Sequence, residues 1–170
     1  MSSNGLVGRY FCQAPALFYL AVDAPGSNVN GAYSGTVRLY KFNGSIWDQL
    51  GGGIHGEGET DVVAPMLGAL TPYEGYLDLS ADGTNVAIGA PGHDGNHTDT
   101  GRTPVFQFNA NENKWEQFGQ SIDGVAVNDG SGISVALNEN GKTLVIGAYW
   151  YFNAIGVSTG YTRVFEATSV

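Results

Sequence analysis

The stretch LDLSADGTNVAIGAP, at Leu77–Pro91, decides the fold, because it consists of two short apolar runs around a turn. The Asp82-Gly83 pair tolerates the positive φ angle that a tight hairpin requires. Val135–Tyr149, VALNENGKTLVIGAY, repeats the arrangement with Asn140-Gly141 at the turn. No stretch of the chain has sustained helical periodicity. We therefore predict an all-β protein that contains at least two copies of one hairpin.

The hairpin belongs to a longer repeat. A glycine and an aromatic-rich strand follow it as GTVRLY from Gly35, GRTPVF from Gly101 and GYTRVF from Gly160. Two of these copies continue into Trp-x-Gln-aliphatic/aromatic-Gly, at Trp47–Gly51 and Trp115–Gly119, and the third stops before reaching it. The period, roughly 60 residues, is close to the roughly 40–50 of a four-stranded propeller blade.

We predict a β-propeller-like fold of four-stranded antiparallel meander blades, in an incomplete ring of about three blades. The single domain has blade 1 at about 11–61, blade 2 at about 74–129 and blade 3 at about 130–170. We expect about three strands in the first blade, four in the second and three in the third, which lacks its last strand. Closed propellers typically use 4–8 blades, so this array leaves faces and strand edges open to another chain.

Composition limits the classes of function. The 170 residues are 42% hydrophobic, which suffices for one substantial core. A net charge of −9 with seven scattered Lys and Arg residues argues against nucleic acid as a partner. No segment has the ~18–20 apolar residues of a membrane span. Cys12 is the only cysteine, so no intrachain disulfide forms.

Two N-x-S/T sequences, at Asn43 and Asn96, fall in predicted loops, where a glycan fits. They favour an extracellular or cell-surface location, although an Asn-, Gly- and Ser-rich chain also produces such sequences by chance. The sequence leaves the compartment open.

The stretch LSADGTNVAIGAPGHDGN, followed by Gly101, an aromatic strand, KWEQFG and SIDG, resembles the FG-GAP-like repeats related to the integrin α-subunit propeller. The likeness covers residues 18–166. It implies a β-propeller with a binding or assembly role and no catalytic residues.

Calcium is the one cofactor that this resemblance raises. Integrin-type blades bind calcium through a D-x-D/N-x-D-G loop, but the two hairpin turns here carry too few carboxylates and are interpreted as plain turns. Asp94, Asn96 and Asp99 offer three oxygen ligands in the next loop, fewer than the 6–8 that calcium prefers. A calcium site there is a subordinate hypothesis, and no other cofactor is expected.

Four consecutive aromatic residues, Tyr149, Trp150, Tyr151 and Phe152, replace the Pro-Gly loop of the other copies. Alternate side chains of a strand point to opposite sides, so some of them are expected on the surface. We predict that they form a contact site for a partner, because Tyr and Trp commonly anchor binding partners.

The predicted function is a non-catalytic binding or assembly module that contacts a protein or carbohydrate partner through loops and exposed blade edges. The alternative is a structural subunit whose partner, or a second copy, completes the blade array. A metal-dependent hydrolase ranks third, because the sequence has no nucleophile motif and no carboxylate pair stands out among its 16 acidic residues.

Overall fold

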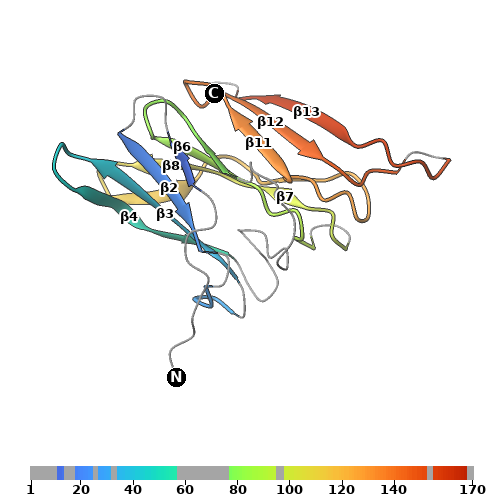
Figure 1. The fold of residues 1–170 in the computed structure, drawn as a ribbon, viewed down its shortest axis with the longest axis horizontal. Helices are drawn as coiled ribbons and strands as arrows, with labels where there is room; N and C mark the ends of the chain where they lie inside the picture. The colour runs from blue at the N-terminus through green and yellow to red at the C-terminus, as the bar shows by residue number, and fades with distance from the viewer. Residues whose placement is uncertain are drawn as a thin grey trace.

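The structure is a computed structural model, and it describes residues 11–13, 18–24, 27–31, 34–56, 77–94, 98–152 and 155–167. Every regular element in these ranges is a β-strand, and every pair of neighbouring strands is antiparallel. The strands form three main sheets that follow one another along the chain and lie side by side (Figure 1). The all-β prediction is confirmed.

The first sheet has four strands in the order β1-β2-β3-β4, where the sequence suggested three. They are β1 (Phe11–Gln13), β2 (Tyr19–Asp23), β3 (Thr36–Phe42) and β4 (Trp47–His55). The additional strand is β1, which pairs with Leu20–Val22 of β2. Three residues are too few to show the period-2 alternation that marks a strand in a sequence.

The second and third sheets repeat this meander. The second runs β5-β6-β8-β9, and the third, with one strand fewer, runs β11-β12-β13. A short pair, β7 with β10, continues β8 and β9 beyond interruptions at Pro104 and at residues 118–121. The bounds are β5 (Leu77–Leu79), β6 (Asn85–Ile88), β7 (Arg102–Thr103), β8 (Val105–Asn109), β9 (Lys114–Gln117), β10 (Ile122–Asp123), β11 (Ser134–Leu137), β12 (Thr143–Ala148) and β13 (Tyr161–Glu166).

The two hairpin turns are plain turns, as the sequence predicted. Gly83 and Gly141 have φ angles of 67° and 68°, and each donates its N–H over 2.9 Å to the carbonyl three residues back. Partial burial alone would raise the pKa of Asp82, but hydrogen bonds from Ser80 and Thr84 outweigh it and lower that pKa. Asp82 therefore orders the turn as an acceptor.

The hydrophobic core lies between the sheets, in two separate clusters. The first cluster joins the first and second sheets: Ala21, Val37, Leu39, Ile54, Leu77, Leu79, Val86 and Ile88. The second joins the second and third sheets: Ala87, Val105, Val135, Leu144 and Ile146. Each core needs a face from two sheets, so the second sheet is covered on both faces.

A hydrogen bond from a side chain to the backbone joins the outer strands of the first two sheets. Trp115 of β9 donates its Nε1–H to the Leu50 carbonyl of β4 over 3.0 Å. The indole also lies against the Phe108 ring, with the ring centroids 5.2 Å apart. Trp47 occupies the same repeat position, and its ring centroid lies 5.2 Å from that of Phe42. Its side chain is 44% exposed, however, because no described sheet precedes its own.

Truncating these two tryptophans is expected to have unequal effects. Trp115→Phe should lower the free energy of unfolding by about 1 kcal/mol, since it removes the hydrogen bond and keeps a ring. Trp115→Ala should lower it by about 2–3 kcal/mol, because the half-buried ring is lost as well. The matched variant Trp47→Ala should cost less than about 1 kcal/mol. Urea unfolding of the variants measures this, and equal costs at the two positions would contradict the packing described.

Candidate functional site

The outer edge of β13 is the first component of the candidate site. Just after β13, Ala167 donates its N–H to the Lys142 carbonyl, on the side of β12, over 2.7 Å. Because backbone groups alternate in direction along a strand, those of Val164 and Glu166 point away from β12, toward the outer edge. In the second sheet the corresponding edge is occupied, since Phe118 N–H bonds the Val105 carbonyl over 2.7 Å. Within the described ranges no strand pairs with the outer edge of β13 (Figure 1). This edge is therefore available for pairing.

An apolar pocket of about 650 Å³ lies beside this edge, between the second and third sheets. Most of its walls are hydrophobic side chains from both sheets, and Phe118 at its rim is 41% exposed. The apolar lining residues are Val105, Phe118, Ile122, Leu137, Leu144 and Phe165.

The same place between the first and second sheets is filled. A Cβ atom added to Gly51 would lie 3.0 Å from the Asn113 carbonyl oxygen and 3.3 Å from the Phe108 ring. Gly119 takes the place of Gly51 in the next repeat, with a similar φ of 74° against 61°, yet a Cβ there would meet nothing within 4 Å. The pocket is thus the site that a fourth strand of the third sheet would fill.

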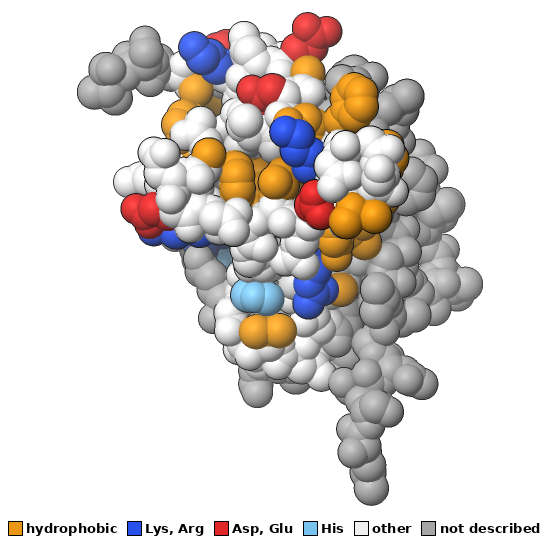
Figure 2. Space-filling model, turned by 90° about the vertical axis from the view of Figure 1, so that its left-hand side faces the viewer, with side chains coloured by type: hydrophobic (Ala, Val, Ile, Leu, Met, Phe, Trp, Pro, Cys, Tyr) orange, Lys and Arg blue, Asp and Glu red, His pale blue; other side chains and the backbone are white. Residues whose placement is uncertain are grey.

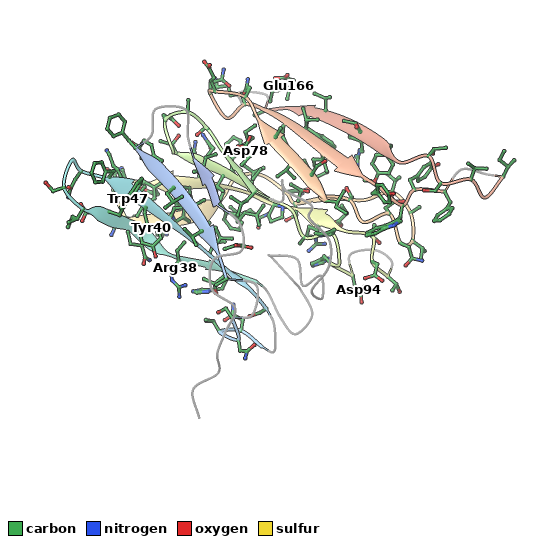
Figure 3. All side chains as sticks on the ribbon, in the orientation of Figure 1. Arg38, Tyr40, Trp47, Asp78, Asp94 and Glu166 are labelled. Atoms are coloured by element: carbon green, nitrogen blue, oxygen red, sulfur yellow. The ribbon has the colours of Figure 1, made fainter. Side chains whose placement is uncertain are left out.

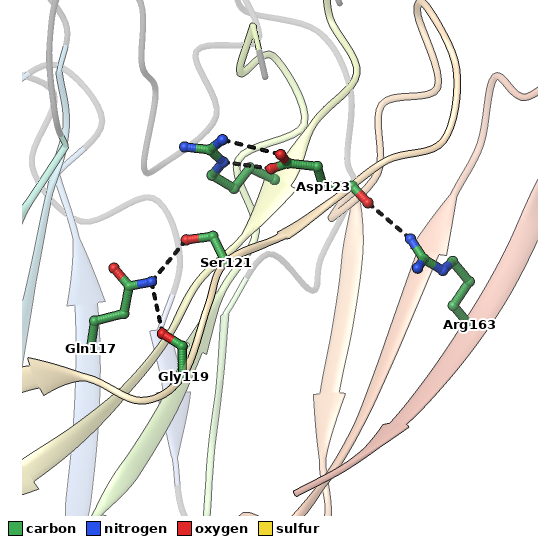
Figure 4. A network of polar contacts seen from close by, with 6 residues as sticks. Gln117, Gly119, Ser121, Asp123 and Arg163 are labelled. Atoms are coloured by element: carbon green, nitrogen blue, oxygen red, sulfur yellow. Dashed lines mark hydrogen bonds and ion pairs between the residues drawn. The ribbon is translucent and has the colours of Figure 1, made fainter. Parts of the chain in front are cut away.

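A polar network holds the wall of the pocket in place (Figure 4). Gln117 donates to the Gly119 carbonyl over 3.2 Å and to Ser121 Oγ over 3.1 Å. Arg102 binds Asp123 with two hydrogen bonds of 2.6 and 3.1 Å, the strong bidentate geometry for this pair. Because these bonds fix residues 117–123, the pocket is preorganised.

Bonds between the second and third sheets fix their relative position as well. Asp78 Oδ2 accepts the Leu137 N–H over 2.7 Å, and Asp78 lies near the middle of the molecule (Figure 3). Arg163 of β13 donates to the Asp123 carbonyl over 2.8 Å (Figure 4). The open edge is therefore presented in a defined orientation.

The predicted aromatic contact site divides into exposed and packed residues. Tyr149 and Phe152 are 56% and 53% exposed. Trp150 is 37% exposed, although its ring also covers Gly130, whose added Cβ would lie 2.6 Å from that ring. Tyr151 packs edge-on against Tyr161, with ring centroids 5.4 Å apart.

A shallow pocket of about 350 Å³ adjoins Tyr149 and is also lined by Ser158, Thr159 and Tyr161. Partner contact at these aromatic residues stays a prediction, and Tyr149 and Phe152 are its most accessible members.

Buried Asp129 was not singled out from the sequence, although it anchors this region. Its Oδ2 accepts the N–H groups of Val125 and Ala126 over 2.7 and 2.8 Å, and the Tyr161 hydroxyl over 2.9 Å. An Asp-Gly pair normally indicates an exposed turn, and nothing local indicates that this one lies under the third sheet. Burial and the Asp129 carboxylate both raise the pKa of Tyr161.

Removing the Tyr161 hydroxyl is expected to destabilise the protein. Tyr161→Phe should lower the free energy of unfolding by about 1–3 kcal/mol, because buried Asp129 loses a donor. Tyr151→Phe is the matched control and should change it by less than about 0.5 kcal/mol.

This prediction has a pH dependence. The raised pKa means that the folded state favours the neutral phenol, so its contribution is complete below the ordinary value of 10.0 and disappears as the pH rises through the folded-state pKa. Denaturant unfolding from neutral to high pH tests this, and a Tyr161→Phe protein that loses stability there as the native protein does would contradict it.

Two of the three residues proposed for calcium, Asp94 and Asp99, are described and lie close together, and a calcium site there stays a prediction. Asp94 lies in an exposed loop (Figure 3) and its Oδ1 accepts the Asp99 N–H over 2.8 Å. Asn96 lies outside the described residues. No group of three His, Cys, Asp or Glu side chains in the described ranges is placed to hold a metal ion.

The predicted glycan acceptors can be located only in part, because Asn96 is again outside the described residues. Asn43 is exposed, and its Oδ1 accepts two backbone N–H groups of its own turn, from Ser45 and Ile46 at 3.0 Å each. Its use as an acceptor stays a prediction.

The side of the molecule that carries the first sheet mixes charges (Figure 2). Lys and Arg side chains lie scattered among acidic, hydrophobic and uncharged polar ones on its described surface. No helix in the described part of the chain has the length and apolarity that a membrane span requires.

Comparisons with known proteins bear on the fold alone. No protein-family model matches the chain, and no curated protein matches it. The periplasmic gluconolactonase of Pseudomonas aeruginosa is similar in structure, with a TM-score of 0.50 and 16% identity over 95% of this chain and 39% of that chain. A provisionally assigned 6-phosphogluconolactonase of Bacteroides uniformis has a TM-score of 0.49 and 15% identity, over 98% of this chain and 42% of that chain.

The fold is a partial β-propeller. The chain spans about two fifths of the length of these structures. Its sheets of three and four antiparallel strands are blades, and the coarse part of the sequence-based assignment, a propeller, is confirmed. The finer resemblance to FG-GAP repeats has no support from the comparisons.

Proposed function

We propose that this protein is a non-catalytic assembly module of FG-GAP-like propeller repeats, which binds another protein chain at the open edge of the third blade. The observation that carries the proposal is the contrast between Gly51, which is enclosed by the next blade, and Gly119, which faces open space. Exposed Phe118, the apolar pocket and the outward backbone groups of β13 all lie at this position. Exposed strand edges next to apolar surface are favoured sites for adding a strand from another chain.

The structural roles of three buried or half-buried carboxylates support the non-catalytic part. Asp123 is held by Arg102, Asp78 accepts a backbone amide of the neighbouring sheet, and Asp129 anchors a loop. Carboxylates fixed in this way organise the fold. Hydrolysis of gluconolactone by the purified chain, absent from a heat-denatured sample, would overturn this part of the proposal.

Self-association of the purified chain tests the open edge. Edge strands pair with one another, so the solution mass should rise with concentration. Val164→Lys should shift the association to higher concentration, since a charge on an edge strand opposes pairing. Because the Val164 side chain is 63% exposed, this substitution is expected to leave the fold intact.

Sedimentation velocity at a series of concentrations measures this association. Ile46→Lys is the matched control, because Ile46 is also an exposed apolar side chain but lies in a turn of the first blade. A native protein that stays monomeric throughout, or equal effects of the two lysines, would contradict assembly through β13.

A second candidate function, carbohydrate binding, rests on the pocket beside Tyr149. Aromatic rings next to the hydroxyl groups of Ser158 and Thr159 offer both an apolar face and hydrogen-bonding groups, which suits a sugar. Tyr149→Ala should then abolish saturable glycan binding in an array or by calorimetry. Trp47→Ala, which alters an exposed aromatic residue of the first blade, should leave it unchanged. Retained binding in Tyr149→Ala would exclude this site.

A further inference from the structure

We propose that the open edge of the third blade takes one extended segment of a partner chain, with the pattern Trp-basic-Gln-aliphatic/aromatic-Gly. This inference rests on the proposed function and specifies the chemistry of the partner. It follows from three observations: the strands that fill the same place in the first two blades, the vacant contacts at the third, and the charge of the residue that the new strand would face.

The first two blades define what each position of the pattern does. Trp47 and Trp115 each pack on a phenylalanine of the neighbouring strand, and in both pairs the ring centroids are 5.2 Å apart. The glutamine two residues later bends back to the glycine carbonyl, as Gln49 does to Gly51 over 3.0 Å and Gln117 to Gly119 over 3.2 Å. The glycine itself has a positive φ in both repeats, which favours Gly at that position. The pattern is therefore a set of structural requirements.

The third blade presents the matching contacts. Val164 stands where Val105 stands in the second blade, so its carbonyl is placed to accept the N–H of the residue before the glycine, as Val105 does from Phe118. Ala167 replaces Phe108, the residue opposite Trp115, and leaves room for an indole. Phe118 takes the place of Leu50, so its carbonyl is the expected acceptor for the indole N–H.

The third blade differs from the other two at the position that would face the residue after the tryptophan. In the first blade Asp48 pairs with Lys41, and in the second Glu116 pairs with Gln107. The corresponding residue of β13 is Glu166, which is exposed near the end of the strand (Figure 3). Like charges directly opposite one another destabilise a strand pair, so an acidic residue is disfavoured here and Lys or Arg is favoured. The net charge of −9 acts in the same direction during encounter.

The test uses synthetic peptides that copy the outer strand of the second blade. The parent peptide is KWEQFGQSIDG, the sequence of Lys114–Gly124, and the second carries Glu116→Lys. A third adds Trp115→Ala to the second. Labelled peptides are titrated with the native protein by fluorescence anisotropy, at concentrations where sedimentation finds the protein monomeric.

The Glu116→Lys peptide should bind saturably, about fivefold more tightly than the parent at low salt, with a smaller difference at high salt. Loss of the indole should weaken binding by about thirtyfold, as expected when an anchoring Trp is truncated. Equal affinities of the parent and lysine peptides would overturn the charge rule. Equal affinities with and without the indole would overturn the pocket assignment, and absence of binding by every peptide would overturn the proposal.

Two protein variants locate the bound peptide. Val164→Pro removes the outward N–H of an edge strand, a position where proline is tolerated, and should abolish binding. Val164→Thr keeps the N–H and a side chain of similar shape, and should retain it. In the native protein, the peptide should also slow hydrogen exchange of the Val164 and Glu166 amides, a readout that does not depend on how Val164→Pro folds. Unchanged exchange at saturation would overturn the edge assignment.

These results separate the inference from the proposed function. If the peptides do not bind but Val164→Lys still weakens self-association, the edge is used and only the sequence pattern is wrong. If Val164→Lys has no effect on association, the proposed function fails as well.

Discussion

Face-to-face packing of neighbouring sheets is the constraint on which the rest of this structure depends. Each sheet is only a few strands wide, and its apolar residues are buried only when a second sheet covers them. The Val37–Leu39 region of the first blade and the Val86–Ile88 region of the second meet in one cluster, and Ala87 and Val105 meet the third blade in another. Burial of this kind is the main favourable contribution to folding. Within the described residues, no further sheet packs on the outer faces of the first and third blades.

Close packing between the blades requires backbone to meet backbone. A Cβ at Gly89 would lie 1.9 Å from the Gly132 carbonyl oxygen, and one at Gly101 would lie 2.1 Å from that of Ser131. The connection that leads to the third blade thus runs directly across the second, and no side chain fits between them. Asp129 bonds the backbone of this same connection and the Tyr161 hydroxyl from a fully buried position. The third blade is consequently fixed to the second by polar contacts as well as by its apolar core.

This rigidity gives the open edge its significance for binding. Under the proposed function, a partner strand would meet a preformed pocket, an oriented row of backbone groups and a fixed wall of hydrogen-bonded residues. Little conformational entropy is then lost from this chain on binding, which favours affinity. Selectivity between partners would come from the single acidic side chain of Glu166 and from the pocket beside it. The exposed rings of Tyr149 and Phe152 form a separate surface, at the other end of β13 from Glu166.

The sequence by itself determined the all-β class, the repeat, the two hairpin turns and the propeller assignment, because these depend on local patterns: period-2 alternation, Asp-Gly and Asn-Gly turns, and recurrence of Trp-x-Gln. It undercounted the strands of the first blade, where about three were expected and the structure has four, and it missed buried Asp129, whose local signal is that of an exposed turn. It also could not divide the four aromatic residues into exposed and packed members.

Only the tertiary structure decided which equivalent positions are filled and which are open. Gly51 and Gly119 have the same neighbours in the repeat pattern and nearly the same backbone conformation, but one lies under the next blade and the other beside a pocket. That difference arises from contacts between residues far apart in the chain, which a repeated local pattern does not encode.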